Sequence, residues 1–450
     1  MVDIVALLHC LQPHVTATTL RQCSRIALAM LVMTGRVTML GISRWAGKGG
    51  SYRTVQRFFA TVIPWATLLW VFFRHHVYRP GEGYLLVGDE GVATKAGKHT
   101  YGLDRFFASL YGKPVPGLAF FTLSLVSTQQ RRSFPLRVEQ VVRSDAEKTA
   151  RKAKAARRQQ RPSTAKRRPG RPKGSKNKPA ADVPLTPELG RITGMLGALQ
   201  QLIAGVVPLT YLLLDGHFGH DHALQMARQH HLHLISKLRC DAALYFPYAG
   251  PYRGRGPRRK YGRKVDYTTL PETYLQETTV EGDMQTRLYQ MQLLHKEFTQ
   301  PLNVVIIVKT NLRTQAQAHV VLFSSDLTLA YAPLVDYYSL RFQIEFNFRD
   351  AKQYWGLEDF MNITPAGVTN AANLALFMVN VSSRLQADGR QGDPAYSVLD
   401  LTADSRAYKY VEETIKMLPE KPAPVLLTKI LNQVAGLGRI HATQPSFSFS

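Results

Sequence analysis

The sequence predicts a mixed α/β fold, in which a sheet domain is flanked by helices. After Pro80 and Gly81, helical periodicity gives way to short apolar runs that are bounded by turn residues. These runs predict strands at residues 84–88, 117–126, 134–142, 209–214 and 233–237. The first three runs follow one another, whereas helical segments precede and follow the fourth, at Thr186-Pro187-Glu188 and after Gly219. Strands gathered first and alternating with helices later predict an α/β sheet.

Residues 1–80 are predicted to form a helical DNA-binding domain. Apolar residues recur there at helical intervals, and residues 49–58 contain a glycine-rich turn followed by Ser51, a candidate N-cap. The helix after Ser51 would carry Arg53 and Arg57 on one face because they are four residues apart. This helix is a candidate recognition helix of a helix-turn-helix unit. The alternative is a helical bundle with a solvated basic face.

Charge and composition point to a nucleic-acid partner. The 450 residues are 45% hydrophobic, enough for a buried core, and carry a net charge of +25. Such a positive field attracts phosphate backbones and releases their counterions. An acidic membrane surface is the alternative, but the longest apolar stretch, residues 60–73, is too short to span a bilayer and contains Pro64. Three distant cysteines and no recognisable secretory signal predict a cytoplasmic, nucleoid-associated protein.

Two basic segments are candidate DNA contacts. Residues 131–178 hold 18 Lys or Arg against three acids, and the middle of this segment is predicted to be disordered without a ligand. Residues 144–181 are predicted to form a basic linker. Within it, residues 168–174 resemble an AT-hook, in which Arg171 and Lys173 would enter the minor groove of A·T-rich DNA. The alternative is a solvated linker. Residues 239–300 are predicted to be a β-rich insertion, with a basic cluster between two tyrosines: Arg253, Arg255, Arg258, Arg259 and Lys260. A flexible loop is the alternative there.

Three acids form the candidate catalytic set. Asp89 and Asp215 each follow an apolar run, so both are expected at the C-terminal end of a buried strand. The third, Glu345, lies in a helix predicted over about residues 334–355. In that helix Tyr338, Arg341, Glu345 and Lys352 would fall within an arc of about 60°. An ion-pair network is the alternative for this polar face.

The spacing Tyr338-x2-Arg341-x3-Glu345-x6-Lys352 resembles the Tyr-Arg-Glu-Lys signature of DDE transposases of bacterial insertion sequences in the IS-four-like superfamily. Residues 87–91 and 213–218 resemble the segments around the first and second Asp of that family, and residues 254–264 resemble its Gly-Arg-rich stretch. The resemblance covers about residues 84–357. One departure is Glu90, where the commonest version of the first segment has a second Asp.

The resemblance implies an RNase H-like catalytic core, which we assign to residues 81–238 and 301–386, interrupted by the β-rich insertion. Helical periodicity predicts a helical tail in residues 387–450. It implies that Asp89, Asp215 and Glu345 bind Mg²⁺, for which Mn²⁺ could substitute, and hard oxygen ligands suit such ions. Tyr338, Arg341 and Lys352 would hold phosphates. The implied reactions are cleavage at transposon ends and strand transfer into double-stranded target DNA by a homodimer in a synaptic complex.

Three other functions are compatible with parts of the sequence. A DNA-binding descendant of a transposase would use the basic segments alone, although binding does not require clustered acids. A standalone RNase H-like nuclease would act on RNA or branched DNA, which the AT-hook-like segment disfavours. A zinc site at His217, His220 and His222 lacks the cysteine or further carboxylate that would complete a ligand set.

Overall fold

The computed structural model describes residues 4–108, 111–159, 185–252, 254 and 257–441. Its strands are β1 (Tyr84–Thr94), β2 (Asp104–Ala108), β3 (Lys113–Ser127), β4 (Arg132–Gln140), β5 (Tyr211–Leu213), β6 (His233–Leu238), β7 (Leu244–Pro247), β8 (Tyr261–Lys264), β9 (Leu275–Glu281), β10 (Met284–His295), β11 (Leu302–Asn311) and β12 (Gln317–Ser324). Its α-helices are α1 (Ile4–Leu8), α2 (Ala17–Val32), α3 (Met39–Trp45), α4 (Tyr52–Ala60), α5 (Trp65–His76), α6 (Asp145–Gln159), α7 (Pro187–Ile203), α8 (Asp221–Gln229), α9 (Tyr331–Leu340), α10 (Gln343–Gln353), α11 (Pro365–Gly389), α12 (Val398–Lys416) and α13 (Pro424–Ala435).

The described strands form one mixed sheet, in the order β2-β3-β1-β5-β6-β12-β11-β10-β7-β8, with β4 also paired to β3 and β9 to β10. Strands β1, β3 and β4 are antiparallel, whereas β1, β5 and β6 are parallel. The mixed α/β fold that the sequence predicts is therefore confirmed. The order β4-β3-β1-β5-β6 fits the RNase H-like domain that the resemblance implied.

Each of the five predicted apolar runs contains a strand, and α7 and α8 occupy the predicted helical segments. Helix α7 begins where the sequence predicts. The Thr186 side chain caps it by accepting a hydrogen bond from Leu189 N, and Pro187 follows at the first helical position. Burial explains why the runs are apolar. Strand β3 is buried from Gly117 to Ser127, with helices or neighbouring strands on both sides.

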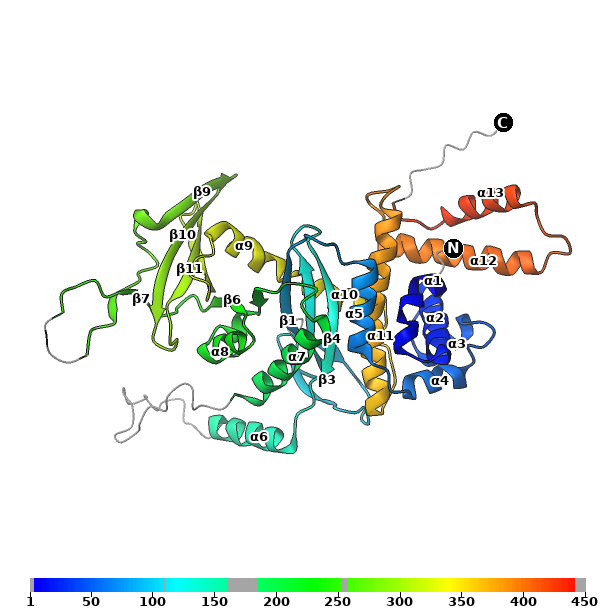
Figure 1. Ribbon diagram of the computed structural model, residues 1–450, viewed down its shortest axis with the longest axis horizontal. Coiled ribbons are helices and arrows are strands. Elements are labelled where there is room, and N and C mark those ends of the chain that lie inside the picture. Colours follow the sequence, from blue (N-terminus) through cyan, green and yellow to red (C-terminus); the bar gives the residue numbers. More distant parts are fainter. Residues whose placement is uncertain (1–3, 109–110, 160–184, 253, 255–256, 442–450) are drawn as a thin grey trace.

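Strands of the predicted insertion are continuous with the central sheet. Strand β10 pairs with β11 along ten residue pairs, from Met284↔Asn311 to Leu293↔Leu302. Strand β11 pairs with β12, and β12 pairs with β6 of the central part. In Figure 1 the strands β7, β9, β10 and β11 extend to the left of the centre, whereas α5 and α11 cover the sheet on its right.

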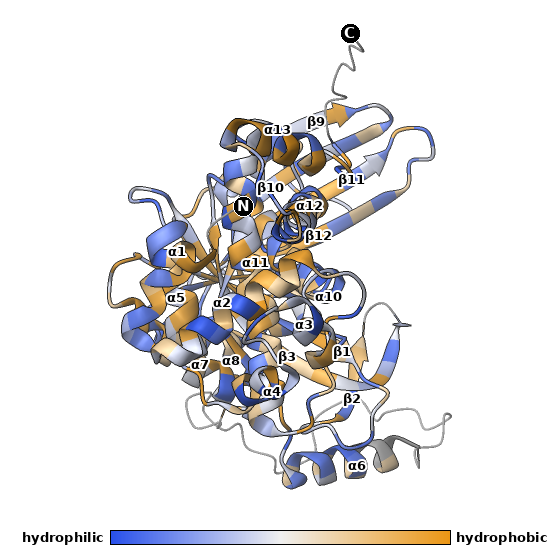
Figure 2. Ribbon diagram, turned by 90° about the vertical axis from the view of Figure 1, so that its right-hand side faces the viewer, coloured by the Kyte–Doolittle hydropathy of each residue, from blue (hydrophilic) through white to orange (hydrophobic). Residues whose placement is uncertain are grey.

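The N-terminal helices pack against α11 and the sheet. Helix α5 is hydrophobic over most of its length (Figure 2), and it contacts β4 and α11. Asn370 on α11 joins the two parts: its Oδ1 accepts from Trp65 Nε1 at 2.8 Å, and its Nδ2 donates to Phe59 O at 2.8 Å. Residues of α2, α4 and α5 share one buried core with the strands. This packing anchors α4, whose Arg53 and Arg57 side chains are exposed on its outer face.

The prediction of one uninterrupted helix over residues 334–355 is wrong, because α9 and α10 are separate helices. The chain tightens between them into a 3₁₀-type turn, in which Phe342 N donates to Ser339 O and Glu345 N donates to Phe342 O. Neither proline nor glycine marks this turn. Angular positions calculated for a continuous helix therefore do not apply across Arg341.

In the part of the chain that the structure describes, no single helix is both long enough and apolar enough to cross a membrane. Helices α4 and α5 meet those criteria only as a pair, and they are bent by 99° where they join.

Candidate active site

Asp89 and Asp215 lie beside each other because their strands pair in parallel. The register of β1 and β5 is Leu86↔Leu212 and Val87↔Leu213, and β5 ends there. Continued by two residues, the same register places Asp89 opposite Asp215. Asp215 follows its strand as predicted, but the prediction that Asp89 ends a strand is wrong, since β1 continues to Thr94 along β3. Only the β5 edge of β1 is free beyond Val87.

Glu345 reaches the two aspartates from the first turn of α10. Asp89, Asp215 and Glu345 line one open cavity of about 420 Å³, together with Arg341 and Lys352 among others. A glycine lets α10 approach β1 closely. A Cβ built on Gly91 would lie only 2.3 Å from ring carbons of Phe348 on α10. The absence of a side chain at Gly91 therefore sets how near Glu345 comes to the strands.

The Arg341 guanidinium stands between two of the acids. Its Nη1 lies 3.4 Å from Asp89 Oδ2, and its Nη2 donates to Glu345 Oε1 at 2.9 Å. The side chain is only 14% exposed, and its Nε is buried without a hydrogen-bond partner among the described residues. A buried charged donor without a partner is costly. Arg341 therefore has one buried donor that no described residue satisfies.

Burial is the main influence on Asp89, and it raises the pKa of this carboxyl to about 6. Arg341 and the N–H of Glu90, which donates to Asp89 Oδ1 at 2.8 Å, act in the opposite direction, whereas the nearby Asp215 and Glu345 carboxylates raise the pKa further. Asp215 is fixed by its backbone neighbours: its Oδ1 accepts from His217 N at 3.1 Å. The site thus brings like charges together and shields one of them from water.

Three of the four signature side chains line this cavity, and Tyr338 is not among its lining residues. Tyr338 faces the same group of charges: its ring centre is 5.9 Å from Arg341 Cζ, and burial raises the pKa of its hydroxyl. Lys352 lines the cavity and lies 3.4 Å from Glu358 Oε1. Glu358 also accepts from Thr94 N at 3.2 Å, which ties the end of α10 to the end of β1.

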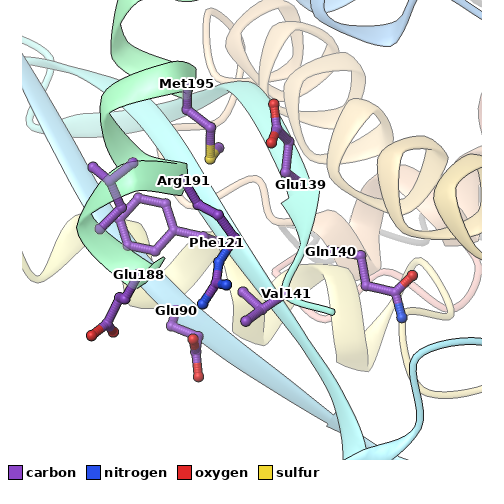
Figure 3. Close-up of a pocket in the computed structure, with 9 residues that line it drawn as sticks. Glu90, Phe121, Glu139, Gln140, Val141, Glu188, Arg191 and Met195 are labelled. Carbon is purple, nitrogen blue, oxygen red and sulfur yellow. The ribbon is translucent and has the colours of Figure 1, made fainter. Parts of the chain in front are cut away.

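Glu90, where the sequence departs from the commonest family pattern, also borders a second, small cavity between β1 and α7. Figure 3 shows Glu90 near Glu188 and Arg191 of α7. Glu188 Oε2 lies 3.4 Å from His217 Nε2, and this contact raises the pKa of His217. Glu188 thus joins the surroundings of the aspartates, a role that its position in a helix N-terminus did not indicate. Two exposed aromatic residues that no motif marks, Phe107 and Tyr111, also line the main cavity.

The other predicted DNA contacts lie away from this cavity. Arg258 and Arg259, between β7 and β8, stack on Tyr252 and Tyr248 with Cζ-to-ring distances of 5.2 and 4.9 Å. Lys260 is exposed beside them and donates to Thr299 O at 3.4 Å. In Figure 1, β7, which leads into this connection, and α4, which carries Arg53 and Arg57, lie at opposite sides of the molecule. Arg171, Lys173, Arg253 and Arg255 lie outside the described residues.

The donor chemistry of the main cavity fits a hard divalent cation, since its acids offer oxygen ligands and no cysteine. Among residues 4–108, 111–159, 185–252, 254 and 257–441, no three His, Cys, Asp or Glu side chains are close enough to hold a metal ion together. At the main cavity, Arg341 stands between Asp89 and Glu345. Of the three histidines that raised the zinc alternative, His217 meets Glu188 and His220 Nδ1 accepts from Ala223 N, whereas His222 Nε2 is buried without a hydrogen-bond partner among the described residues.

The large mixed sheet, with two aspartates and a helix-borne glutamate at one open cavity, fits an RNase H-like domain of the DDE type. The chain matches the family described as DDE superfamily endonuclease over residues 10–296, and it belongs to that family. This family places it among enzymes that act on DNA. The matched residues include Asp89 and Asp215 and end before Glu345. No curated protein matches the chain.

Proposed function

We propose that the protein is a DNA transposase that cleaves DNA at transposon ends and joins the ends to target DNA. The observation that carries the proposal is the convergence of Asp89, Asp215 and Glu345, from three separate elements, on one open cavity. Acids that repel phosphate serve no purpose in binding alone. Their presence in a DNA-acting family therefore favours catalysis over a purely DNA-binding descendant.

In this proposal Asp89, Asp215 and Glu345 hold Mg²⁺, with Mn²⁺ as a substitute. The bound ions would activate a water or a 3′-hydroxyl and stabilise the leaving oxygen in an in-line displacement. The Arg341 guanidinium, Tyr338 and Lys352 would contact the phosphates. Transposition brings two ends together, so we also propose that the active form is a homodimer.

The test is cleavage of a DNA fragment that carries the element's own ends, with wild type compared to Glu345→Gln in Mg²⁺ and Mn²⁺. Nicking at the end boundary that is lost in the variant, while binding of the fragment persists, supports the proposal. Glu281→Gln is the matched control, because Glu281 is exposed on β9. Binding without cleavage by any of the proteins in either metal would favour the DNA-binding descendant.

The raised pKa of Asp89, about 6, predicts an acid limit on metal-dependent cleavage. Protons and the metal compete for the same carboxylate, so at limiting Mg²⁺ the rate should fall about tenfold for each pH unit below this pKa. Saturating Mg²⁺ should move the fall to lower pH. The measurement is the cleavage rate from pH 5 to 8 at two Mg²⁺ concentrations. A profile that does not respond to Mg²⁺ concentration would assign the limit to another group.

The basic connection between β7 and β8 should contribute backbone contacts to DNA. We expect the triple replacement of Arg258, Arg259 and Lys260 by glutamine to weaken duplex binding. Each lost phosphate contact should reduce the slope of log affinity against log salt by about 0.9. Equilibrium binding at several salt concentrations measures this. Arg239→Gln is the control, since Arg239 is already paired with Asp241 at 2.9 Å. An unchanged slope would show that this connection does not touch the backbone.

A further inference from the structure

Another cavity, distinct from the small one beside Glu90, lies on the opposite face of α10 from the acids. It has a volume of about 350 Å³ and is walled by α10, α11, the β3–β4 turn and the start of α12. Helix α10 contributes Asn347 and Asp350 to this cavity, whereas it contributes Glu345 and Lys352 to the catalytic one. The two cavities share no lining residue. We call the cavity on the far side of α10 the arginine cavity, after its four arginines: Arg131, Arg132, Arg349 and Arg390.

Two of these arginines are neutralised by the protein itself. Arg131 Nη1 lies 2.8 Å from Asp336 Oδ1, and Arg349 Nη2 lies 2.8 Å from Asp350 Oδ1. These pairs leave Arg132 and Arg390 as the two arginines of the cavity walls whose charge no carboxylate balances.

Arg132 and Arg390 have no carboxylate within ion-pair distance in the described part of the chain. Arg132 Nη1 donates to Ser383 Oγ at 3.2 Å. Arg390 Nε donates to Tyr396 O at 3.0 Å, and its Nη2 donates to Gln386 Oε1 at 3.3 Å. Both residues are half-buried, and burial lowers the pKa of Arg390. Each positive charge is thus held partly out of water by neutral oxygens alone.

Such an arrangement stabilises the folded protein poorly, because withdrawing a charge from water costs free energy that neutral acceptors only partly offset. An anion in the cavity would remove that cost. The planar fork of a guanidinium matches phosphate oxygens, and the hydroxyl of Ser383, which accepts from Arg132, could donate to the same phosphate. The volume accommodates a phosphate group with its ester neighbours.

We propose that the arginine cavity is a phosphate-binding site, held by Arg132 and Arg390 and separate from the catalytic cavity. Its ligand is a backbone phosphate of bound DNA or a free phosphate compound. As a DNA site it rests on the proposed function and deepens it, because a phosphate there would be held across α10, about 10 Å thick, from Glu345. Helix α10 would then connect the phosphate-binding residues to the catalytic acids.

The first arm of the test measures thermal stabilisation of the full chain by inorganic phosphate and by pyrophosphate, at constant ionic strength set with chloride. We expect Arg390→Gln to weaken the apparent phosphate affinity at least about tenfold, as expected for loss of a charge-assisted pair. Arg390→Lys should restore part of it. Arg384→Gln, on the same helix and already paired with Asp388, is the matched control. If Arg390→Gln does not fold, Arg132→Gln tests the same site.

The second arm measures duplex DNA affinity against salt in EDTA, so that cleavage plays no part. A slope reduced by about 0.9 in the Arg390→Gln protein identifies a backbone phosphate as the ligand. A lost phosphate response with an unchanged slope identifies a free phosphate compound. If wild type and variants respond alike to phosphate and their slopes agree, the site does not exist. Neither arm measures cleavage. A protein that does not cleave DNA could still bind phosphate at this site, so failure of the proposed function can be told apart from failure of this inference.

Discussion

Replacing Asp89 with asparagine is expected to lower the DNA cleavage rate at least about 1000-fold while making the metal-free protein more stable at pH 8. The rate should fall because asparagine cannot supply the negative oxygen that a metal requires. Stability should rise because burial raises the pKa of Asp89 from 3.8 to about 6 in the folded protein. The charged carboxylate is thus less favourable in the folded than in the unfolded chain.

The stability gained by the asparagine variant should depend on pH, because the Asp89 carboxyl has different pKa values in the folded and unfolded chains. The cost of the charge increases as pH rises from about 4 to about 6 and is constant above, where it amounts to about 3 kcal/mol for this shift. Below pH 4 the carboxyl is neutral in both states and the advantage of asparagine should vanish. The measurement is denaturant unfolding at pH 4 and pH 8 in EDTA, beside cleavage in Mg²⁺. Asp241→Asn is the control, because Asp241 is exposed. A variant that is less stable at pH 8 would show that the attraction between Asp89 and Arg341 outweighs the cost of burying the charged carboxylate.

Local sequence patterns predicted which segments form the elements of the core. Apolar runs followed by an aspartate became β5 and the first half of β1, since the part of a strand that is covered on both faces excludes polar residues. The N-cap at Thr186 also carried over, because capping depends on neighbours in sequence. Arg341 and Glu345 pair as well, although the helix is interrupted between them. The fold class and the gathering of these acids were therefore accessible from the sequence.

Contacts between distant segments were not accessible in the same way. Arg341 meets Asp89 across 252 positions, and no local pattern states that an arginine would stand between two of the acids. Asp89 lies inside β1 because the pairing of β1 with β3 extends to Thr94, whereas its pairing with β5 ends at Val87. The turn between α9 and α10 also escaped detection, since tertiary packing can tighten a helical chain without a breaking residue.

Gly91 illustrates a distant contact with a testable consequence. Replacing it with alanine is expected to destabilise the protein by about 1–3 kcal/mol and to slow cleavage by about 100-fold. The added Cβ would lie 2.3 Å from the Phe348 ring, so α10 must shift away from β1 and take Glu345 with it. Backbone strain plays no part, because Gly91 is not among the glycines with positive φ. Chemical denaturation and the cleavage rate in Mg²⁺ measure the two effects.

A second substitution separates the clash from other causes. Phe348→Ala alone should destabilise by about 3–5 kcal/mol because it leaves a cavity. Combined with Gly91→Ala, it should cost clearly less than the sum of the two changes, since the ring that the new Cβ meets is gone. Gly190→Ala is the control: nothing lies within 4 Å of a Cβ there, and alanine in the helix α7 should be neutral or stabilising. Strict additivity of the two replacements would mean that Gly91 serves a purpose other than the approach of α10, and Glu345 would then owe its position to different contacts.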